Sequence, residues 1–122
     1  MTGTDVITRA LSLLNYTDRR GAVDASQTSE FFRRGLPLLN AILADLLFIQ
    51  RKSLTEMKSA SDEVPLDEAT TTGVMVYGVA MLMAQSENDG DNQQIFALLY
   101  NQKRNTVTRE IGQRRDALPV PE

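Results

Sequence analysis

The stretch from residue 67 to residue 88 constrains the fold of this chain most strongly. Its middle, from Val74 to Met83, carries no charge, and its apolar side chains are distributed around the whole helical wheel. A helix that is apolar on every side is normally buried among other helices. The uncharged run is too short to span a bilayer, which needs about 20 residues. We therefore predict a central helix in a helical domain, and no membrane span.

Three further segments show helical patterning. Apolar residues recur at helical spacing over residues 4–15 and 25–50, and a dense apolar run opens residues 92–110. Residues 50–66 are polar and aperiodic, and a loop of this length is usually functional or disordered. The fold class is thus expected to be all-α, a small bundle of four main helices with a long loop between helices 2 and 3.

Side chains expected in the core lie on the apolar faces of these helices. They are Met75, Val79, Leu82, Leu39, Leu43, Leu46, Leu11 and Leu99. The methionines of the central helix could instead form an adaptable binding face, but their spacing in an uncharged run favours the core. Gly73 and Gly78 would let another helix approach closely, within the chain or between subunits.

Capping residues predict where the helices begin and end. Thr2 with Asp5 forms a capping-box pattern, and Asp24 and Asp67 are suited to begin the second and the central helix. Gly90 is suited to a left-handed cap, and Asp91 to the start of the last helix.

Gly35, Leu36 and Pro37 interrupt the second helix. Proline inside a helix removes one hydrogen bond and costs about 3 kcal/mol unless the helix bends or breaks. We expect a kink or two helices that meet at Leu36, and a simple bend is favoured over a functional hinge.

The C-terminal end of the chain is the region where charge is lopsided. Its basic residues are Lys103, Arg104, Arg109, Arg114 and Arg115. They form either a solvated helix end, which the helix dipole favours, or a contact with an acidic partner or with phosphates. The closing residues contain two prolines and cannot continue a helix. We predict one helical domain over residues 1–111 and an extended tail over residues 112–122.

Composition excludes much catalytic chemistry. The chain has no Cys and no His, which removes disulfides, thiol nucleophiles, His bases and the usual zinc ligands. Glu63, Asp67 and Glu68 form the one tight acidic group, and helix capping explains them better than a metal does. We predict no catalytic, cofactor-binding or metal-binding residues, and hence no enzyme.

Nucleic-acid binding and secretion are also disfavoured. The net charge of −3 argues against a protein that grips nucleic acid. The connection between the first two helices is too long for a helix-turn-helix motif. No signal-peptide pattern opens the chain, so we expect synthesis inside the cell, in the cytoplasm.

Four stretches of the chain together resemble a phage family. They are DVITRALSLLNY, LPLLNAILADLL, VPLDEATTTGVMVYGVAMLMAQSEND and QIFALLYNQKRNTV. Their order and spacing resemble the head-tail connector proteins, the head-completion adaptors of tailed phages and prophages, which are similar to the tail accessory factors of short-tailed phages. The resemblance covers nearly the whole chain, although the long C-terminal extension of the short-tailed members is missing.

The resemblance implies a structural role in the neck of the virion. Members form a closed ring of about a dozen subunits, which requires heterologous head-to-tail contacts. The ring sits under the portal protein, binds neck or tail proteins and joins the head to the tail, while DNA passes through the channel as cargo. The isolated chain could remain a monomer, with residues 50–66 and 102–122 mobile until they dock.

Candidate partner or ring contacts follow from the same reading. They are Lys58, Asp62 and Glu63 in the loop, together with Lys103, Arg104, Arg109, Arg114 and Arg115. The alternative function is a non-enzymatic helical protein-interaction or regulatory module. A carboxylate-dependent helical enzyme is the weakest reading, because no paired acidic helix motif is present. Ring formation would distinguish the head-tail connector from the interaction or regulatory module.

Overall fold

The computed structural model confirms an all-α bundle of four main helices. It describes residues 1–14 and 25–117, and the side chains of residues 1–14 and 33–108. The elements are α1 (Gly3–Leu13), α2 (Ala25–Ile49), α3 (Glu68–Thr70), the π-helical turn η1 (Thr71–Met75), α4 (Val76–Ser86) and α5 (Gly90–Ala117). α3, η1 and α4 follow one another without a gap and together form the central helix.

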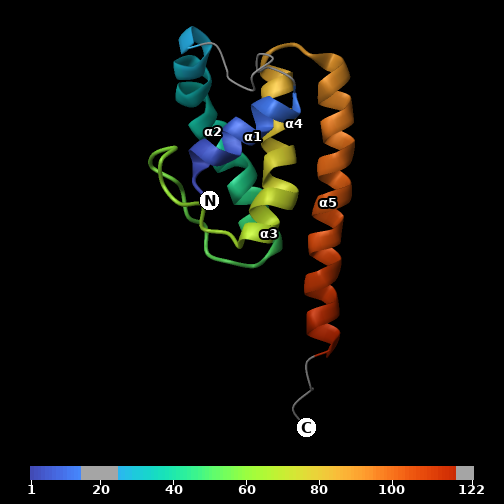
Figure 1. Cartoon of the computed structure of the whole chain (residues 1–122). Coiled ribbons are helices and arrows are strands. Elements are labelled where there is room, and N and C mark those ends of the chain that lie inside the picture. Colours follow the sequence, from blue (N-terminus) through green and yellow to red (C-terminus); the bar gives the residue numbers. More distant parts are fainter. Residues whose placement is uncertain (15–24, 118–122) are drawn as a thin grey trace.

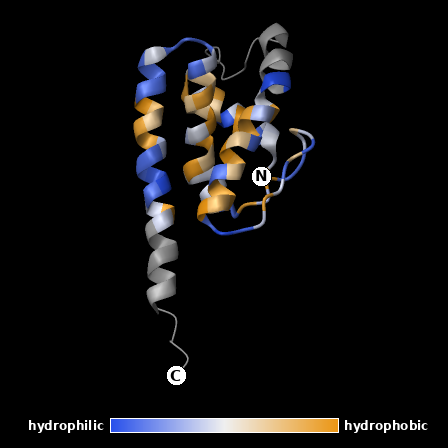
Figure 2. Ribbon diagram, turned by 180° about the vertical axis from the view of Figure 1, so that it is seen from behind, coloured by the Kyte–Doolittle hydropathy of each residue, from blue (hydrophilic) through white to orange (hydrophobic). Residues whose placement is uncertain are grey.

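The other helices surround the central helix. In Figure 1, α2 lies to its left, α5 to its right, and α1 crosses its near side. α5 packs mainly against α4. Its lower part extends beyond the rest of the bundle (Figure 1). Hydrophobic residues are concentrated in the central helix and the helices beside it (Figure 2).

The predicted core is confirmed at all but two positions. Met75, Val79, Leu39, Leu43, Leu46 and Leu11 are buried, whereas Leu82 and Leu99 are half-buried. Met83 is also buried, so the methionines of the central helix belong chiefly to the core.

Two glycines allow close helix contacts. A Cβ atom on Gly35 of α2 would lie 2.6 Å from Ile7 Cδ1 of α1, and one on Gly78 of α4 would lie 2.9 Å from Ile42 Cδ1 and from Tyr100 Cε2. Real Cβ atoms do not approach other atoms this closely. Gly78 therefore serves tight packing within the chain, whereas a Cβ on Gly73 would have no neighbour within 4 Å.

The predicted caps of α1 and of the central helix are confirmed. Asp5 N donates to Thr2 Oγ1 at 3.2 Å, and Thr2 N donates to Asp5 Oδ2 at 3.0 Å, which completes the capping box. Asp67 accepts from Thr70 N at 3.0 Å and from Thr70 Oγ1 at 2.8 Å. These bonds satisfy backbone donors that the first turn of a helix leaves unpaired.

The predicted caps between the central helix and α5 are wrong. Asn88, with φ of 56°, takes the left-handed conformation expected of Gly90. Asn tolerates this conformation because its short side chain can bond locally. Asp89, not Asp91, caps the start of α5, since its Oδ1 accepts from Asn92 N at 3.3 Å. Gly90 is the first residue of α5. The predicted cap at Asp24 lies outside the described residues.

α2 continues through Pro37 as one helix of 25 residues. The alternative of two helices meeting at Leu36 is therefore wrong. Pro37 is exposed, so the interrupted hydrogen bond lies on the side of α2 that water can reach, where the lost bond is least costly.

The loop over residues 50–66, which was expected to be mobile until it docks, is tied to the bundle. Its backbone hydrogen bonds to the start of the chain are Gly3 N to Asp62 O at 3.1 Å, Thr4 N to Ala60 O at 2.7 Å, and Val64 N to Met1 O at 2.9 Å. Asn40 of α2 bonds both backbone groups of Met57, and the side chains of Met57 and Val64 are buried. The predicted mobility of this loop has lost its physical basis.

α5 is longer than predicted. It continues to Ala117, so residues 112–117 are helical rather than part of an extended tail. The remaining tail residues, 118–122, lie outside the described residues. The observed helix adds about two turns to the part of α5 that leaves the bundle.

Candidate functional site

A cluster of polar side chains joins α2 to α5. Asp45 on α2 accepts hydrogen bonds from Tyr100 Oη at 2.7 Å and from Arg104 Nε and Nη2 at 2.7 and 2.9 Å. The bonds from Arg104 hold the pKa of Asp45 below its usual value despite burial. Burial, and then Asp45, raise the pKa of Tyr100. Asp45, Tyr100 and Arg104 form hydrogen bonds with one another. The cluster therefore fixes α5 against α2 rather than offering a reactive site.

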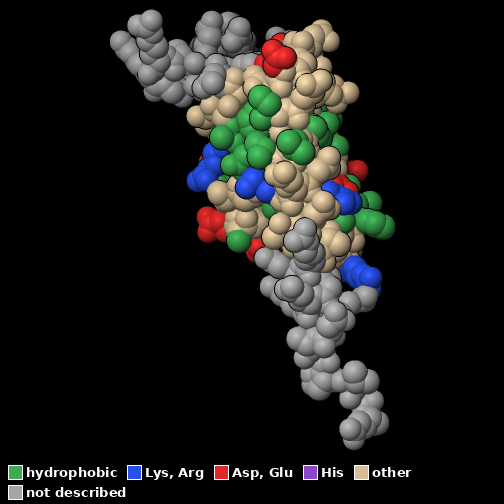
Figure 3. Space-filling view, turned by 90° about the vertical axis from the view of Figure 1, so that its right-hand side faces the viewer, with side chains coloured by type: hydrophobic (Ala, Val, Ile, Leu, Met, Phe, Trp, Pro, Cys, Tyr) green, Lys and Arg blue, Asp and Glu red, His purple; other side chains and the backbone are tan. Residues whose placement is uncertain are grey.

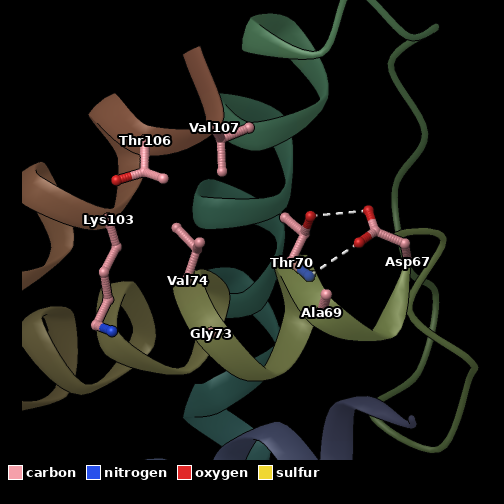
Figure 4. Close-up of a pocket in the computed structure, with 8 residues that line it drawn as sticks. All are labelled: Asp67, Ala69, Thr70, Gly73, Val74, Lys103, Thr106 and Val107. Atoms are coloured by element: carbon pink, nitrogen blue, oxygen red, sulfur yellow. Dashed lines mark hydrogen bonds between the residues drawn. The ribbon is translucent and has the colours of Figure 1, made fainter. Parts of the chain in front are cut away.

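A hollow with a volume of about 390 Å³ lies between the start of the central helix and α5. It is lined by Asp67, Ala69, Thr70, Gly73, Val74, Lys103, Thr106 and Val107. Figure 4 shows the last three entering from α5, opposite the π-helical turn and the capping pair of Asp67 and Thr70. A π-helical turn is frequent at functional sites, and this one lies along the wall of the hollow.

Two polar side chains that line this hollow, Asp67 and Lys103, make contacts within the chain. Both carboxylate oxygens of Asp67 accept bonds from Thr70. Lys103 Nζ lies 4.4 Å from the centroid of the Tyr77 ring, a cation–π contact. Tyr77 in turn lies beside Phe96, with ring centroids 6.1 Å apart. The hollow can take up a side chain of a partner, but it pairs no nucleophile with a base.

The loop residues predicted as partner contacts are partly used within the chain. Asp62 Oδ2 accepts from Lys58 N and Ser59 N at 3.1 and 3.0 Å and closes a turn. Glu63 Oε2 pairs with the amino group of Met1 at 2.8 Å. The side chain of Lys58 is exposed. The structure therefore assigns Asp62 and Glu63 to the shape of the loop and leaves Lys58 accessible.

The predicted basic contacts separate into three kinds. Arg104 forms the internal pair with Asp45, so the expectation that it faces portal or DNA loses its support. Lys103 lines the hollow. The side chains of Arg109, Arg114 and Arg115 lie outside the described residues, although their backbone belongs to α5.

The acidic group near the central helix does not assemble into a metal site. Within residues 1–14 and 33–108, no three acidic side chains converge on a position where they could hold a metal ion. Asp67 caps a helix and Glu63 pairs with Met1, as described above. Glu68 is exposed in the first turn of α3, where the helix dipole favours an anion.

Large apolar side chains that face solvent are the feature that sequence analysis missed. Phe48 on α2 is 78% exposed, Leu54 in the loop 71%, and Leu98 and Ile95 on α5 61% and 53%. Ile95 and Leu98 were assigned only to a dense apolar run. A helical wheel places them opposite Phe96 and Tyr100, and that separation was the signal available in the sequence.

Comparison of the chain with models of protein families, with curated proteins and with solved structures gives no match. Among the described residues, no helix has the length and apolar character needed to cross a membrane.

Proposed function

We propose that this chain is a structural protein of a tailed-phage virion, a head-tail connector that assembles as a ring under the portal. The order and spacing of its sequence elements support the proposal. The observation that carries it is the outward position of Phe48, Ile95 and Leu98 on a bundle whose core is otherwise filled. A chain that leaves such side chains in water is suited to contacts with other protein surfaces.

The two helices that bear these side chains suit a ring. A closed ring needs two unlike surfaces on each subunit, one for each neighbour. Phe48 lies on α2, and Ile95 and Leu98 lie on α5, so the apolar positions fall on separate elements. A single patch would instead favour a two-fold dimer.

The protruding end of α5 is the proposed portal contact. The lower part of α5, which continues to Ala117, extends beyond the rest of the bundle (Figure 1). Arg109, Arg114 and Arg115 follow Val107 in the sequence. The protruding helix would bind an acidic surface of the portal, and DNA would pass through the ring as cargo.

A reconstitution experiment tests this function. The purified chain is mixed with portal protein and followed by sedimentation velocity and electron microscopy, and we expect rings attached to one face of the portal. A chain that remains monomeric and folded with portal present contradicts the proposal. The neighbouring genes give an independent check, since they should encode portal, capsid and tail proteins.

The hollow beside Lys103 favours a second candidate function, a helical protein-interaction module. An open hollow with one cation and several apolar side chains can receive a segment of a regulatory partner. This candidate requires a one-to-one complex and no ring, so the same sedimentation experiment separates the two.

A further inference from the structure

α5 has two apolar faces, and only one is used within the chain. Phe96, Tyr100 and Val107 are buried against the bundle. Ile95 and Leu98 are three residues apart on the opposite side and therefore adjacent on the helix surface. Figure 3, in which α5 faces the viewer, shows hydrophobic side chains gathered over the upper half of this helix. The acidic residue Asp91 is exposed one turn before Ile95.

α2 has an outer face with matching features. Pro37, Ala41 and Phe48 are exposed, on the side of the helix opposite the buried Leu39 and Leu43. No charged residue interrupts this strip, because Asp45 is turned toward α5. The exposed cationic residue Arg33 precedes Pro37 by four residues, which is one turn closer to the N-terminus of α2. The outer face of α2 thus carries the cation Arg33 followed by Pro37 and Ala41, and that of α5 carries the anion Asp91 followed by the larger Ile95 and Leu98.

Two internal contacts fix the relative heights of α2 and α5. Arg34 pairs with Glu87, just before α5 begins, at 2.9 Å, and Asp45 pairs with Arg104 at 2.7 Å. The two helices therefore run in the same direction. At 1.5 Å per residue, α2 rises by about 16 Å from Arg34 to Asp45, and α5 rises by about 21 Å from its first residue, Gly90, to Arg104. Counted from either contact, Asp91 lies within about 3 Å of the height of Arg33, Ile95 within about 3 Å of that of Pro37, and Leu98 within about 3 Å of that of Ala41.

We propose that the contact between neighbouring subunits joins the outer face of α5 of one copy to the outer face of α2 of the next. The inference rests on the proposed ring and deepens it. Rotation about an axis parallel to these helices leaves every residue at its own height, so neighbours meet with Asp91 opposite Arg33. Ile95 and Leu98 then enter the shallow surface formed by Pro37 and Ala41. Opposite charges and complementary side-chain sizes thus coincide in one register.

Disulfide cross-linking tests the contact directly, because the chain has no cysteine of its own. In Ala41→Cys/Leu98→Cys, each copy can link to the next, so a ladder of covalent oligomers is expected on a non-reducing gel of portal-bound protein. A mixture of the two single variants should stop at dimers. Thr8→Cys/Leu98→Cys, with an exposed position on α1, is the matched control and should give no ladder. Dimers of either single variant alone would overturn the head-to-tail contact.

Substitutions test the chemistry of the contact. Leu98→Asp should weaken self-association by at least about tenfold, because it places an unpaired carboxylate in an apolar contact. Leu54→Asp, at an equally exposed apolar position outside the contact, should have no effect. Arg33→Asp and Asp91→Arg should each weaken association, and the double variant should recover most of the loss. Circular dichroism confirms that each variant is folded.

The outcomes separate this inference from the proposed function. Rings on the portal that form without a 41–98 cross-link, and that tolerate Leu98→Asp, overturn the contact but leave the connector function intact. A 41–98 ladder that forms without any binding to portal supports the contact and contradicts the connector function. The inference is also overturned if the ladder is equally strong in the Thr8 control.

Discussion

Arg104 holds Asp45 through both oxygens of the carboxylate, with Nε 2.7 Å from Oδ2 and Nη2 2.9 Å from Oδ1. Tyr100, one turn earlier on α5, donates to the same Oδ2 at 2.7 Å. α5 otherwise packs mainly on α4, so this cluster sets its position relative to α2. The planar guanidinium matches a carboxylate in a fixed orientation. The cluster therefore also sets the register on which the proposed contact between subunits depends.

Asp45→Ala should destabilise the fold by about 1–3 kcal/mol, because it leaves Tyr100 and Arg104 without their acceptor in a partly buried position. Urea denaturation measures the change. Combined with Arg104→Ala, the losses should be less than additive, since both changes remove the same bonds. Glu56→Ala, in the exposed part of the loop, is the control and should stay within about 0.5 kcal/mol. A loss from Asp45→Ala as small as that of the control would contradict this role.

The same cluster predicts how stability depends on pH. The folded pKa of Asp45 is below its ordinary value of 3.8, so its contribution is complete above pH 3.8 and is lost as the pH falls below it. Asp5 and Asp67 also have lowered pKa values, so Asp45→Asn should weaken the acid dependence without removing it. Thermal melts from pH 2 to 7 measure this. If the melting temperature of Asp45→Asn fell at acid pH as steeply as that of the unaltered chain, the role of Asp45 in acid stability would be contradicted.

Tyr100 predicts the behaviour at high pH. Its folded pKa is raised above the ordinary value of 10.0, chiefly by burial. The contribution is therefore complete below pH 10 and is lost as the pH rises above it, because the unfolded chain releases the proton first. Tyr100→Phe should be less stable at pH 7 but should lose less stability between pH 9 and 11 than the unaltered chain does. Urea denaturation of Tyr100→Phe and of the unaltered chain at pH 7, 9 and 11 gives the free energies of unfolding to compare.

Local features of the fold could be predicted from the sequence, because they depend on neighbouring residues. The capping box of Thr2 and Asp5 is defined by a spacing of three, and the buried stripe of Leu39, Leu43 and Leu46 by the helical period. The left-handed residue was misplaced because Gly90 and Asn88 both tolerate that conformation, and the choice between them depends on where Asp89 can cap α5.

Contacts between distant residues could not be predicted. Asp45 and Arg104 are 59 residues apart, and nothing in the sequence near either one indicates the other. The loop was expected to be mobile because its residues are polar and aperiodic, yet its backbone groups bond the first residues of the chain. The exposure of Ile95 and Leu98 depends on which side of α5 meets α4, and both sides are apolar. The sequence separates the two apolar sides of α5, but the packing decides which of them is exposed.

Two glycines of the central helix should respond in opposite ways to the same substitution. Gly78→Ala should destabilise the fold by about 1–3 kcal/mol, because its Cβ would lie 2.9 Å from Ile42 and Tyr100 and would overpack the core. Gly73→Ala should stabilise it by about 0.5–1 kcal/mol, since a Cβ there has no neighbour within 4 Å and alanine favours the helix. Urea denaturation of both variants gives the signs. A Gly78→Ala variant as stable as the unaltered chain would contradict the packing at Gly78, and a destabilised Gly73→Ala variant would contradict the open space at Gly73.

Removal of residues 112–122 should separate folding from docking. The lower part of α5 extends beyond the rest of the bundle (Figure 1), so the urea midpoint of the truncated chain should be nearly unchanged. The deletion removes Arg114 and Arg115 and the last helical residues of α5, which protrudes from the bundle. If this end binds the portal, incorporation into portal-containing particles should fall sharply.

A full-length variant with Arg114→Gln and Arg115→Gln shows how much of that fall is ionic. Salt gives the same information, because ionic binding weakens with salt whereas apolar binding persists. A truncated chain that joins the particles at full occupancy would exclude residues 112–122 as the docking element. The face of α5 that carries Ile95 and Leu98 would then be the next surface to test.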